Sequence, residues 1–143
     1  MCYPRFFIRL SCMSRGPEVI PTLRYRDAPA AIRWLVDVVG FREELVVPGP
    51  DGSISHAQLT WGSGMIMLGS QTDGSDGRMV LDTGPAATYV VIDDVAAHYE
   101  RVVAAGAEVV QKLRDEDYGG QGYSVRDAEG NLWSFGSYRP GSS

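Results

Sequence analysis

The amino-acid sequence repeats its own pattern after 67 residues, the separation of Asp27 and Asp94. Each aspartate follows a short β-prone run and precedes an amphipathic stretch that ends at a glycine, as expected for a strand, a helix N-cap and a helix stop. The same shift superposes four further pairs of apolar residues: Leu23 on Val90, Ile32 on Tyr99, Leu35 on Val102 and Ile66 on Trp133. Two similar modules therefore follow each other along the chain.

The first module is predicted to have the element order βαβββ. Apolar residues recur every three or four positions from Ala28 to Val39, with Pro29 in the first turn and Gly40 as the stop, which is typical of an amphipathic helix. Runs rich in β-branched and aromatic residues, separated by glycine and proline turns, indicate the strands. The predicted strands are Val19 to Tyr25, Phe41 to Val47, Ser53 to Trp61 and Met65 to Leu68.

The second module is predicted to repeat this order after a linker. Residues 71–85 are rich in Gly, Asp, Ser and Thr and show little periodicity, which is typical of a loop. The predicted elements are the strand Thr88 to Ile92, the helix Val95 to Ala105, and the strands Glu108 to Leu113, Gly122 to Arg126 and Leu132 to Phe135. We expect one domain over residues 18–140, with modules at about 18–70 and 86–138, preceded by a tail over residues 1–17.

A four-stranded sheet with a single helix buries only one of its faces, so the other face must be covered by the second module or by a second chain. The predicted fold class is α+β, with two tandem βαβββ modules whose curved mixed sheets enclose a cavity. Exposed sheet edges and unfilled concave faces favour pairing of chains, so we expect a homodimer.

Composition excludes several classes of partner. Thirteen Lys and Arg residues against eighteen Asp and Glu residues give a formal charge of −5, and no basic patch indicates nucleic-acid binding. No stretch approaches the roughly 20 apolar residues of a membrane span. The only two cysteines, Cys2 and Cys12, lie near the N-terminus and cannot form a disulfide that cross-links the rest of the chain. We therefore expect a reducing, cytoplasmic location.

Several motifs together resemble the vicinal oxygen chelate superfamily, which groups glyoxalases, bleomycin resistance proteins and extradiol dioxygenases. They are Tyr25 to Ile32, the Val39-Gly40-Phe41 helix exit, Ile92 to Val95, Ala105-Gly106-Ala107, and Asp127 to Phe135. The resemblance covers about Val19 to Tyr138 and implies the fold described above. It is less informative about the reaction, because this superfamily includes isomerases, dioxygenases, epimerases, thiol transferases and proteins that sequester antibiotics.

The resemblance also implies where a metal would be bound, with one ligand from the first and one from the last strand of each module. Those positions fall on Ile20, Met67, Ala87 and Ser134. None of them carries the imidazole or carboxylate that a divalent Zn, Ni, Fe or Mn ion requires. We therefore expect no metal site and no cofactor.

His56 is the first candidate for chemistry. Ala57 and Leu59 are expected to pack on the helix, so alternation along the strand directs His56 and Gln58 into the predicted cavity. There His56 would act as a general base or orient a ligand by a hydrogen bond. The alternative is a histidine on a partly hydrated sheet face without a chemical role. His98 is expected on the exposed side of the second helix.

The remaining candidate ligand contacts follow from the same alternation. Trp133 and Phe135 are assigned to the helix-facing side, whereas Ser134 is assigned to the cavity. Tyr123 occupies the repeat position of His56 and is expected to line the same surface. The other candidates are Met67 and Tyr89 in the wall, Arg24 as a site for an anion, and Tyr118 in the stretch Asp115 to Gly122, a candidate lid. Alternatively, the wall residues only fill the concave face of the sheet or pack in a dimer interface, and Arg24 reaches into solvent.

The leading functional hypothesis is a metal-free protein that binds a small organic molecule, with an antibiotic as one candidate, in the manner of the sequestering branch. The alternative is an enzyme of lyase or isomerase type that uses His56 with Tyr123 or Gln58, or that recruits a metal at a non-standard place. A purely structural or regulatory dimer is the third hypothesis.

Overall fold

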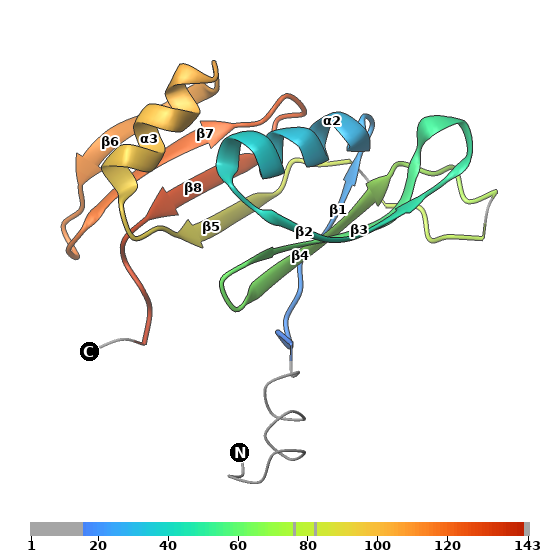
Figure 1. Cartoon of the computed structure of the whole chain (residues 1–143), viewed down its shortest axis with the longest axis horizontal. Coiled ribbons are helices and arrows are strands. Elements are labelled where there is room, and N and C mark those ends of the chain that lie inside the picture. The colour runs from blue at the N-terminus through green and yellow to red at the C-terminus, as the bar shows by residue number, and fades with distance from the viewer. Residues whose placement is uncertain (1–15, 76, 82, 142–143) are drawn as a thin grey trace, which may run out of the picture.

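Two βαβββ modules lie side by side in the computed structural model, which describes residues 16–75, 77–81 and 83–141 (Figure 1). The first contains β1 (Thr22–Tyr25), α2 (Ala28–Arg33), η1 (Trp34–Val39), β2 (Arg42–Pro48), the short 3-10 turn η2 (Pro50–Gly52), β3 (Ile54–Trp61) and β4 (Gly64–Ser70). The second contains β5 (Ala87–Val91), α3 (Val95–Ala104), β6 (Glu108–Asp115), β7 (Gln121–Arg126) and β8 (Leu132–Gly136). The predicted fold class and element order are confirmed.

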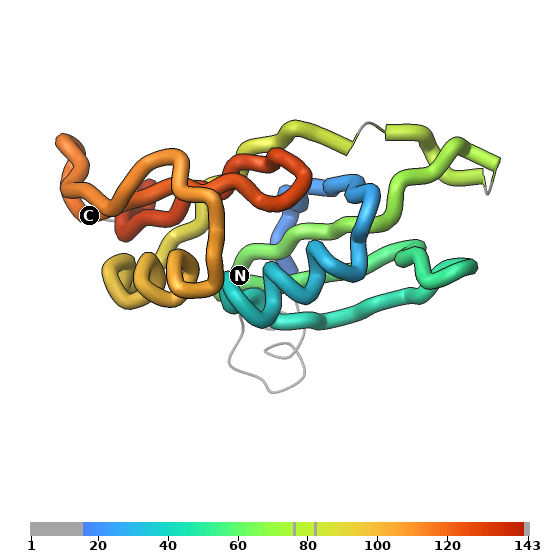
Figure 2. The backbone as a smooth tube through the Cα atoms, turned by 90° about the horizontal axis from the view of Figure 1, so that it is seen from above, coloured from blue at the N-terminus to red at the C-terminus, as the bar shows by residue number. Residues whose placement is uncertain are grey.

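Each module forms one mixed four-stranded sheet. The strand order is β1-β4-β3-β2 in the first sheet, here sheet A, and β5-β8-β7-β6 in the second, sheet B. The first and last strands of each module pair in parallel, and all other neighbours are antiparallel. The segment after β4 runs along the outside of the molecule before it enters β5 (Figure 2).

The two predicted N-caps are confirmed. The Oδ1 atoms of Asp27 and Asp94 accept hydrogen bonds from the backbone N–H groups of Ala30 and Ala97, both at 3.1 Å. These bonds satisfy donors that the first helical turn leaves without an intrahelical partner.

The first helix differs from the prediction in its second half. It was expected to be one regular α-helix over residues 28–39, but η1 is wound as a π-helix. The N–H groups of Gly40 and Phe41 both donate to the carbonyl of Leu35 at 2.9 Å. A π-helical turn accommodates one extra residue, and Gly40, with φ of 110°, ends the helix as predicted.

That extra residue changes the repeat. Leu35 and Val102 remain 67 positions apart, but the helix-ending glycines, Gly40 and Gly106, are 66 apart. The shorter offset persists through the next two strands of each module, because Arg42 pairs with Thr60 as Glu108 pairs with Arg126. The longer β7–β8 turn restores the offset of 67 in the last strand.

One hydrophobic core is shared by both modules. The Phe41 ring lies 5.4 Å from that of Trp61 and 5.9 Å from that of Trp133, measured between centroids. Ala57 and Leu59 are fully buried on the helix-facing side of sheet A, and Trp133 and Phe135 are buried on that of sheet B. The opposite faces of both sheets, here called the open faces, therefore lie outside this core.

Most of the predicted N-terminal tail, residues 1–15, lies outside the described residues. Within the part of the chain that is described, no helix is long and apolar enough to span a bilayer.

Candidate functional site

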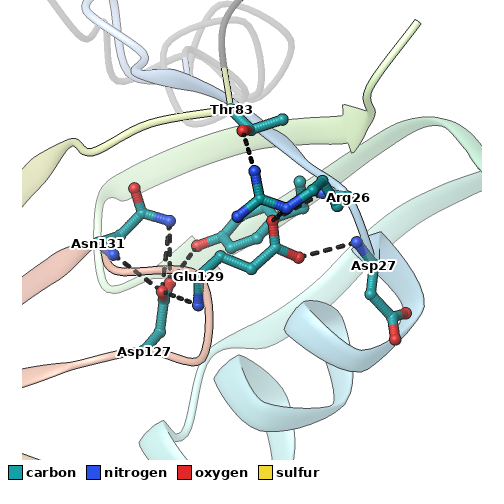
Figure 3. Close-up of polar contacts among 7 residues, drawn as sticks. Arg26, Asp27, Thr83, Asp127, Glu129 and Asn131 are labelled. Atoms are coloured by element: carbon teal, nitrogen blue, oxygen red, sulfur yellow. Dashed lines mark hydrogen bonds and ion pairs between the residues drawn. The ribbon is translucent and has the colours of Figure 1, made fainter.

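The junction between the modules is built around Asp127, in the turn between β7 and β8. Its Oδ2 accepts hydrogen bonds from the hydroxyl of Tyr25 at 2.7 Å and from the indole N–H of Trp133 at 3.1 Å. Its Oδ1 accepts from the backbone N–H groups of Glu129 and Asn131 (Figure 3). Burial raises the pKa of the Tyr25 hydroxyl, and the neighbouring Asp127 carboxylate raises it further, so this phenol remains a donor.

Glu129 joins the same turn to the start of α2. Its Oε1 accepts from the backbone N–H of Arg26 at 2.7 Å, and its Oε2 accepts from that of Asp27 at 2.8 Å (Figure 3). A carboxylate at a helix N-terminus is electrostatically favourable. These bonds fix the β7–β8 turn of one module against the other module, which indicates a structural role.

His98 joins the modules on the other side of the junction, and the prediction that it is exposed is wrong. Its side chain lies in the core at 8% exposure because it has two hydrogen-bonding partners there. The Nε2–H group donates to the carbonyl of Val39 at 2.8 Å, which leaves Nδ1 to accept from the Tyr123 hydroxyl at 2.6 Å. Desolvation lowers the pKa of His98, so the imidazole is neutral near pH 7.

Tyr123 is a second correction, because it lies on the helix-facing side of sheet B and not on the surface that carries His56. It is 1% exposed and pairs across the strands with Phe135, a core residue. The cause is the offset of 66 in this strand, which makes Tyr123 the counterpart of Ala57. A slip of one residue moves a side chain to the opposite face of a sheet. On the open face, Ser124 is the counterpart of Gln58.

A cleft of about 600 Å³ lies at this junction. Tyr25, Trp34, Ala107 and Glu129 line it, and none of the predicted ligand contacts does. Apart from Tyr123, which lies in the core, the predicted ligand contacts lie on the two open faces of the sheets or beside them.

The open face of sheet A carries a chain of hydrogen bonds. Gln58 accepts from Nε2 of His56 at 2.9 Å and donates through Nε2 to the carboxylate of Glu44 at 2.6 Å. Glu44 is the additional residue at a β-bulge between Glu43 and Leu45, which explains how its side chain is directed toward Gln58. Because Nε2 is the donor, Nδ1 of His56 remains available to a ligand.

The open face of sheet B carries hydroxyl groups and aromatic rings. Ser134, a predicted contact, shares a 2.8 Å hydrogen bond with Ser124. The hydroxyl of Tyr89, another predicted contact, donates to the carbonyl of Tyr138 at 2.6 Å. Burial raises the pKa of Tyr89, and the nearby Tyr118 hydroxyl adds to this effect.

The stretch that was predicted as a lid begins in β6 and continues as the hairpin turn into β7. The N–H of Glu116 bonds the carbonyl of Gly120 at 2.9 Å, which closes the turn. Within it, the ring of Tyr118 packs edge-on against Tyr138 at 5.0 Å. Tyr118 therefore belongs to the same aromatic group as Tyr89, although 61% of its surface is exposed.

Sequence reasoning missed the roles of Glu44, Ser124, Asp127 and Tyr138. The segment Asp127 to Phe135 was identified only as a motif of the superfamily resemblance, and Glu44 occupies a bulge that strand alternation does not predict. The repeat could have predicted Ser124: with the offset of 66 that applies to this strand, Ser124 is the counterpart of Gln58.

The model of the Glyoxalase/Bleomycin resistance protein/Dioxygenase superfamily matches residues 19–135. The chain belongs to this superfamily. An uncharacterized protein of Mycobacterium bovis is 34% identical over 125 residues, which cover 84% of this chain and 82% of that protein. The crystal structure of TioX from Micromonospora sp. ML1 is similar with a TM-score of 0.74 and 36% identity, over 87% of this chain and 100% of that chain.

Members of the superfamily with other activities share the fold. Lactoylglutathione lyase from Agrobacterium tumefaciens superposes with a TM-score of 0.65 at 22% identity, covering 85% of this chain and 95% of that chain. At this identity the likeness shows the fold alone.

The four positions where the superfamily resemblance places metal ligands lack suitable side chains. Met67 pairs with Thr22 and Ser134 with Tyr89, so both lie on the open faces. The four side chains, including Ile20 and Ala87, supply a thioether and a hydroxyl but no carboxylate or imidazole, so they do not fit a divalent cation. Within the described ranges, no group of three or more His, Cys, Asp or Glu side chains could hold a metal ion.

Proposed function

We propose that this superfamily member binds a small organic molecule on the open faces of its sheets, without a metal ion and without converting it. The observation that carries the proposal is the composition of these faces. On sheet A, the apolar side chain of Met67 lies beside the hydrogen-bonded pair His56 and Gln58. On sheet B, the ring of Tyr89 lies beside the hydroxyl of Ser134. Ligand sites are typically lined in this way, whereas the metal positions lack suitable donors.

Exposure of large apolar side chains supports the proposal. Leu45 and Val47 on sheet A and Tyr89 on sheet B are each 41–42% exposed. Leu45 pairs with Gln58 and Val47 with His56, so the apolar side chains flank the polar ones. A ligand or a second chain that covered these side chains would gain free energy from the apolar area removed from water.

A screen by thermal denaturation tests the proposal. Antibiotics, 2-oxoaldehydes and aromatic metabolites would be added to the purified protein, and a binding ligand is expected to raise the melting temperature with the logarithm of its concentration above Kd. Antibiotics come first because the superfamily includes bleomycin resistance proteins. A screen in which no compound raises the melting temperature would refute binding.

The metal-free part of the proposal has a separate test. Protein purified without a metal-binding tag is expected to carry no stoichiometric Zn, Ni, Fe or Mn in elemental analysis, and a chelator is expected to leave its melting temperature unchanged. Tightly bound metal whose removal lowers the melting temperature would contradict it.

The second candidate function is acid–base catalysis by His56. The favourable observation is the orientation of the imidazole, because Gln58 holds Nε2 and leaves Nδ1 for a substrate proton. Catalysis predicts that a compound found in the screen is consumed by the wild-type protein, and that His56→Ala abolishes consumption but not binding. Full recovery of the compound after incubation supports binding alone.

A further inference from the structure

We infer that Arg24, on the open face of sheet A, forms a subsite for an organic carboxylate with an apolar body. The inference rests on the proposed function, because it specifies the chemical class of the ligand. Its basis is the placement of the guanidinium group, the absence of an acceptor for Nε among the described residues, and the side chains that lie beside it.

Gly69 makes room for the guanidinium group on the sheet surface. Arg24 in β1 pairs with Gly69 in β4. A Cβ atom on Gly69 would lie 2.9 Å from Nη1 of Arg24 and 3.0 Å from the carbonyl oxygen of Ser55 in β3. The arginine side chain therefore extends across β4 toward β3, with its head group over a residue that has no side chain.

One donor of the guanidinium group has no hydrogen-bond acceptor. Nε of Arg24 is buried and contacts no acceptor among the residues that the structure describes. A buried donor without a partner is unfavourable, and more so when it is charged. The carboxylate of Glu44, on the same face, already accepts from Gln58. An anionic ligand would satisfy Arg24, because a carboxylate can accept two parallel hydrogen bonds from a guanidinium fork.

Neighbouring side chains complete a site for an apolar acid. Extending the antiparallel register by one residue beyond the pair Ala57–Leu68 places His56 opposite Gly69, two strands or about 10 Å from Arg24. Val47 is the next residue along this row, and Met67 and Leu45 lie in the adjacent row beside Gln58. A carboxylate bound at Arg24 thus has polar contacts within reach and apolar surface for its body.

Sheet B also places a side chain of its first strand over the glycine of its last strand, but from a different position. Gly136, the repeat counterpart of Gly69, pairs with Val91, and a Cβ atom on Gly136 would lie 2.7 Å from the hydroxyl of Tyr89. A glycine in the last strand thus accommodates a long side chain from the first strand in both modules. The side chain over the glycine is a positively charged guanidinium group in sheet A and a neutral phenol in sheet B. Of these two positions, only the one in sheet A can pair with an anion.

The test uses 1-naphthoate as the probe and 1-naphthamide as its uncharged analogue, titrated into the purified full-length protein by calorimetry. We expect the carboxylate to bind roughly tenfold or more tightly than the amide, since hydrogen bonds to charged groups contribute about 1.5–3 kcal/mol. Arg24→Met is expected to remove this preference. Arg33→Met, on the exposed side of α2, is the matched control and is expected to retain it.

Two further variants distinguish the loss of the carboxylate subsite from a loss of folding. Arg24→Lys keeps the charge but lacks the fork, so it is expected to bind the carboxylate more weakly than wild type and more tightly than Arg24→Met. Gly69→Ala is expected to weaken carboxylate binding by displacing Nη1. The melting temperature of each unliganded variant reports whether it is folded.

Three results would overturn the inference: equal affinity for naphthoate and naphthamide, no binding of naphthoate at millimolar concentration, or a preference that survives in folded Arg24→Met and Arg24→Lys. These results differ from failure of the proposed function. If neutral or cationic compounds in the screen stabilise the protein while naphthoate does not, binding stands and the carboxylate subsite is wrong.

Discussion

Single polar residues hold the two modules together. Asp127 joins Tyr25 of the first module to Trp133 of the second, and His98 of the second module donates to the carbonyl of Val39 in the first. His98 and the two side chains that donate to Asp127 are buried, so they depend on their hydrogen-bond partners to offset the loss of water. Removing one partner is therefore costly, and the costs are measurable.

His98 should make the protein sensitive to mild acid. Its pKa is lowered in the folded state by burial, so between that value and the unfolded value of about 6.5 the unfolded chain binds more protons. The stability contribution of neutral His98 is complete above about pH 6.5 and decreases as the pH falls below it. We expect the free energy of unfolding, measured by urea denaturation, to fall between pH 7.5 and 5.5.

The two histidines provide the control for this prediction. His98→Gln is expected to be less stable at pH 7.5 but to show a flatter pH dependence over the same interval. His56→Gln, on the open face of sheet A, is expected to retain the wild-type dependence. An unchanged slope in His98→Gln would assign the acid sensitivity to other groups.

Asp127 and Tyr25 should be energetically coupled. Asp127→Ala removes the acceptor for several buried donors and is expected to cost about 3–5 kcal/mol, whereas Tyr25→Phe is expected to cost about 1–2 kcal/mol. In a double-mutant cycle with Tyr25→Phe and Asp127→Asn, the coupling energy is expected to exceed about 0.5 kcal/mol. Additive effects would show that the 2.7 Å hydrogen bond contributes nothing to stability.

At the scale of helices and strands, local sequence rules predicted the elements and their order but failed where one residue is inserted. Strand alternation placed Ala57 and Leu59 in the core correctly, because β3 pairs with β4 without a bulge and no offset had to be transferred from another strand. The same alternation, transferred by a constant offset, placed Tyr123 on the wrong face. The π-helical turn of η1 shortens the offset, and the β7–β8 turn restores it before Trp133, so agreement at the ends concealed the change between them.

The site was less predictable than the elements for a related reason. Gln58 and Ser134 were identified from alternation, but their partners Glu44 and Ser124 depend on a β-bulge and on cross-strand register. Likewise, the burial of His98 depends on the carbonyl of Val39, which is distant in sequence and reaches it only when the modules pack.

The two N-caps give a prediction at this scale. Asp27→Ala and Asp94→Ala are each expected to lower the free energy of unfolding by about 1 kcal/mol, because each removes one hydrogen bond to a helical N–H group. Asp93→Ala is the control, since this exposed neighbour does not cap α3. Urea denaturation measures all three variants, and equal effects of Asp93→Ala and Asp94→Ala would contradict the capping role.

For the molecule as a whole, the open faces of the sheets are where large apolar side chains remain exposed to solvent. The shared core buries the helix-facing sides of both sheets, but Leu45, Val47 and Tyr89 remain about two-fifths exposed on the other sides. Strands β1, β2, β5 and β6 are also sheet edges. Natural proteins cover such faces and edges, and a second copy of the chain provides a symmetric cover.

We therefore expect a homodimer, with a mass by light scattering of twice the chain mass of 15.6 kDa. Leu45→Asp and Val47→Asp place a charge on the open face and are expected to shift the equilibrium toward monomer, because a buried unpaired carboxylate is strongly unfavourable. Val103→Asp, at an exposed position on α3, is the matched control and is expected to remain dimeric. A monomeric wild-type protein at every concentration tested would refute the dimer, whereas an equal loss of dimer in all three variants would show that the interface is not confined to the open face.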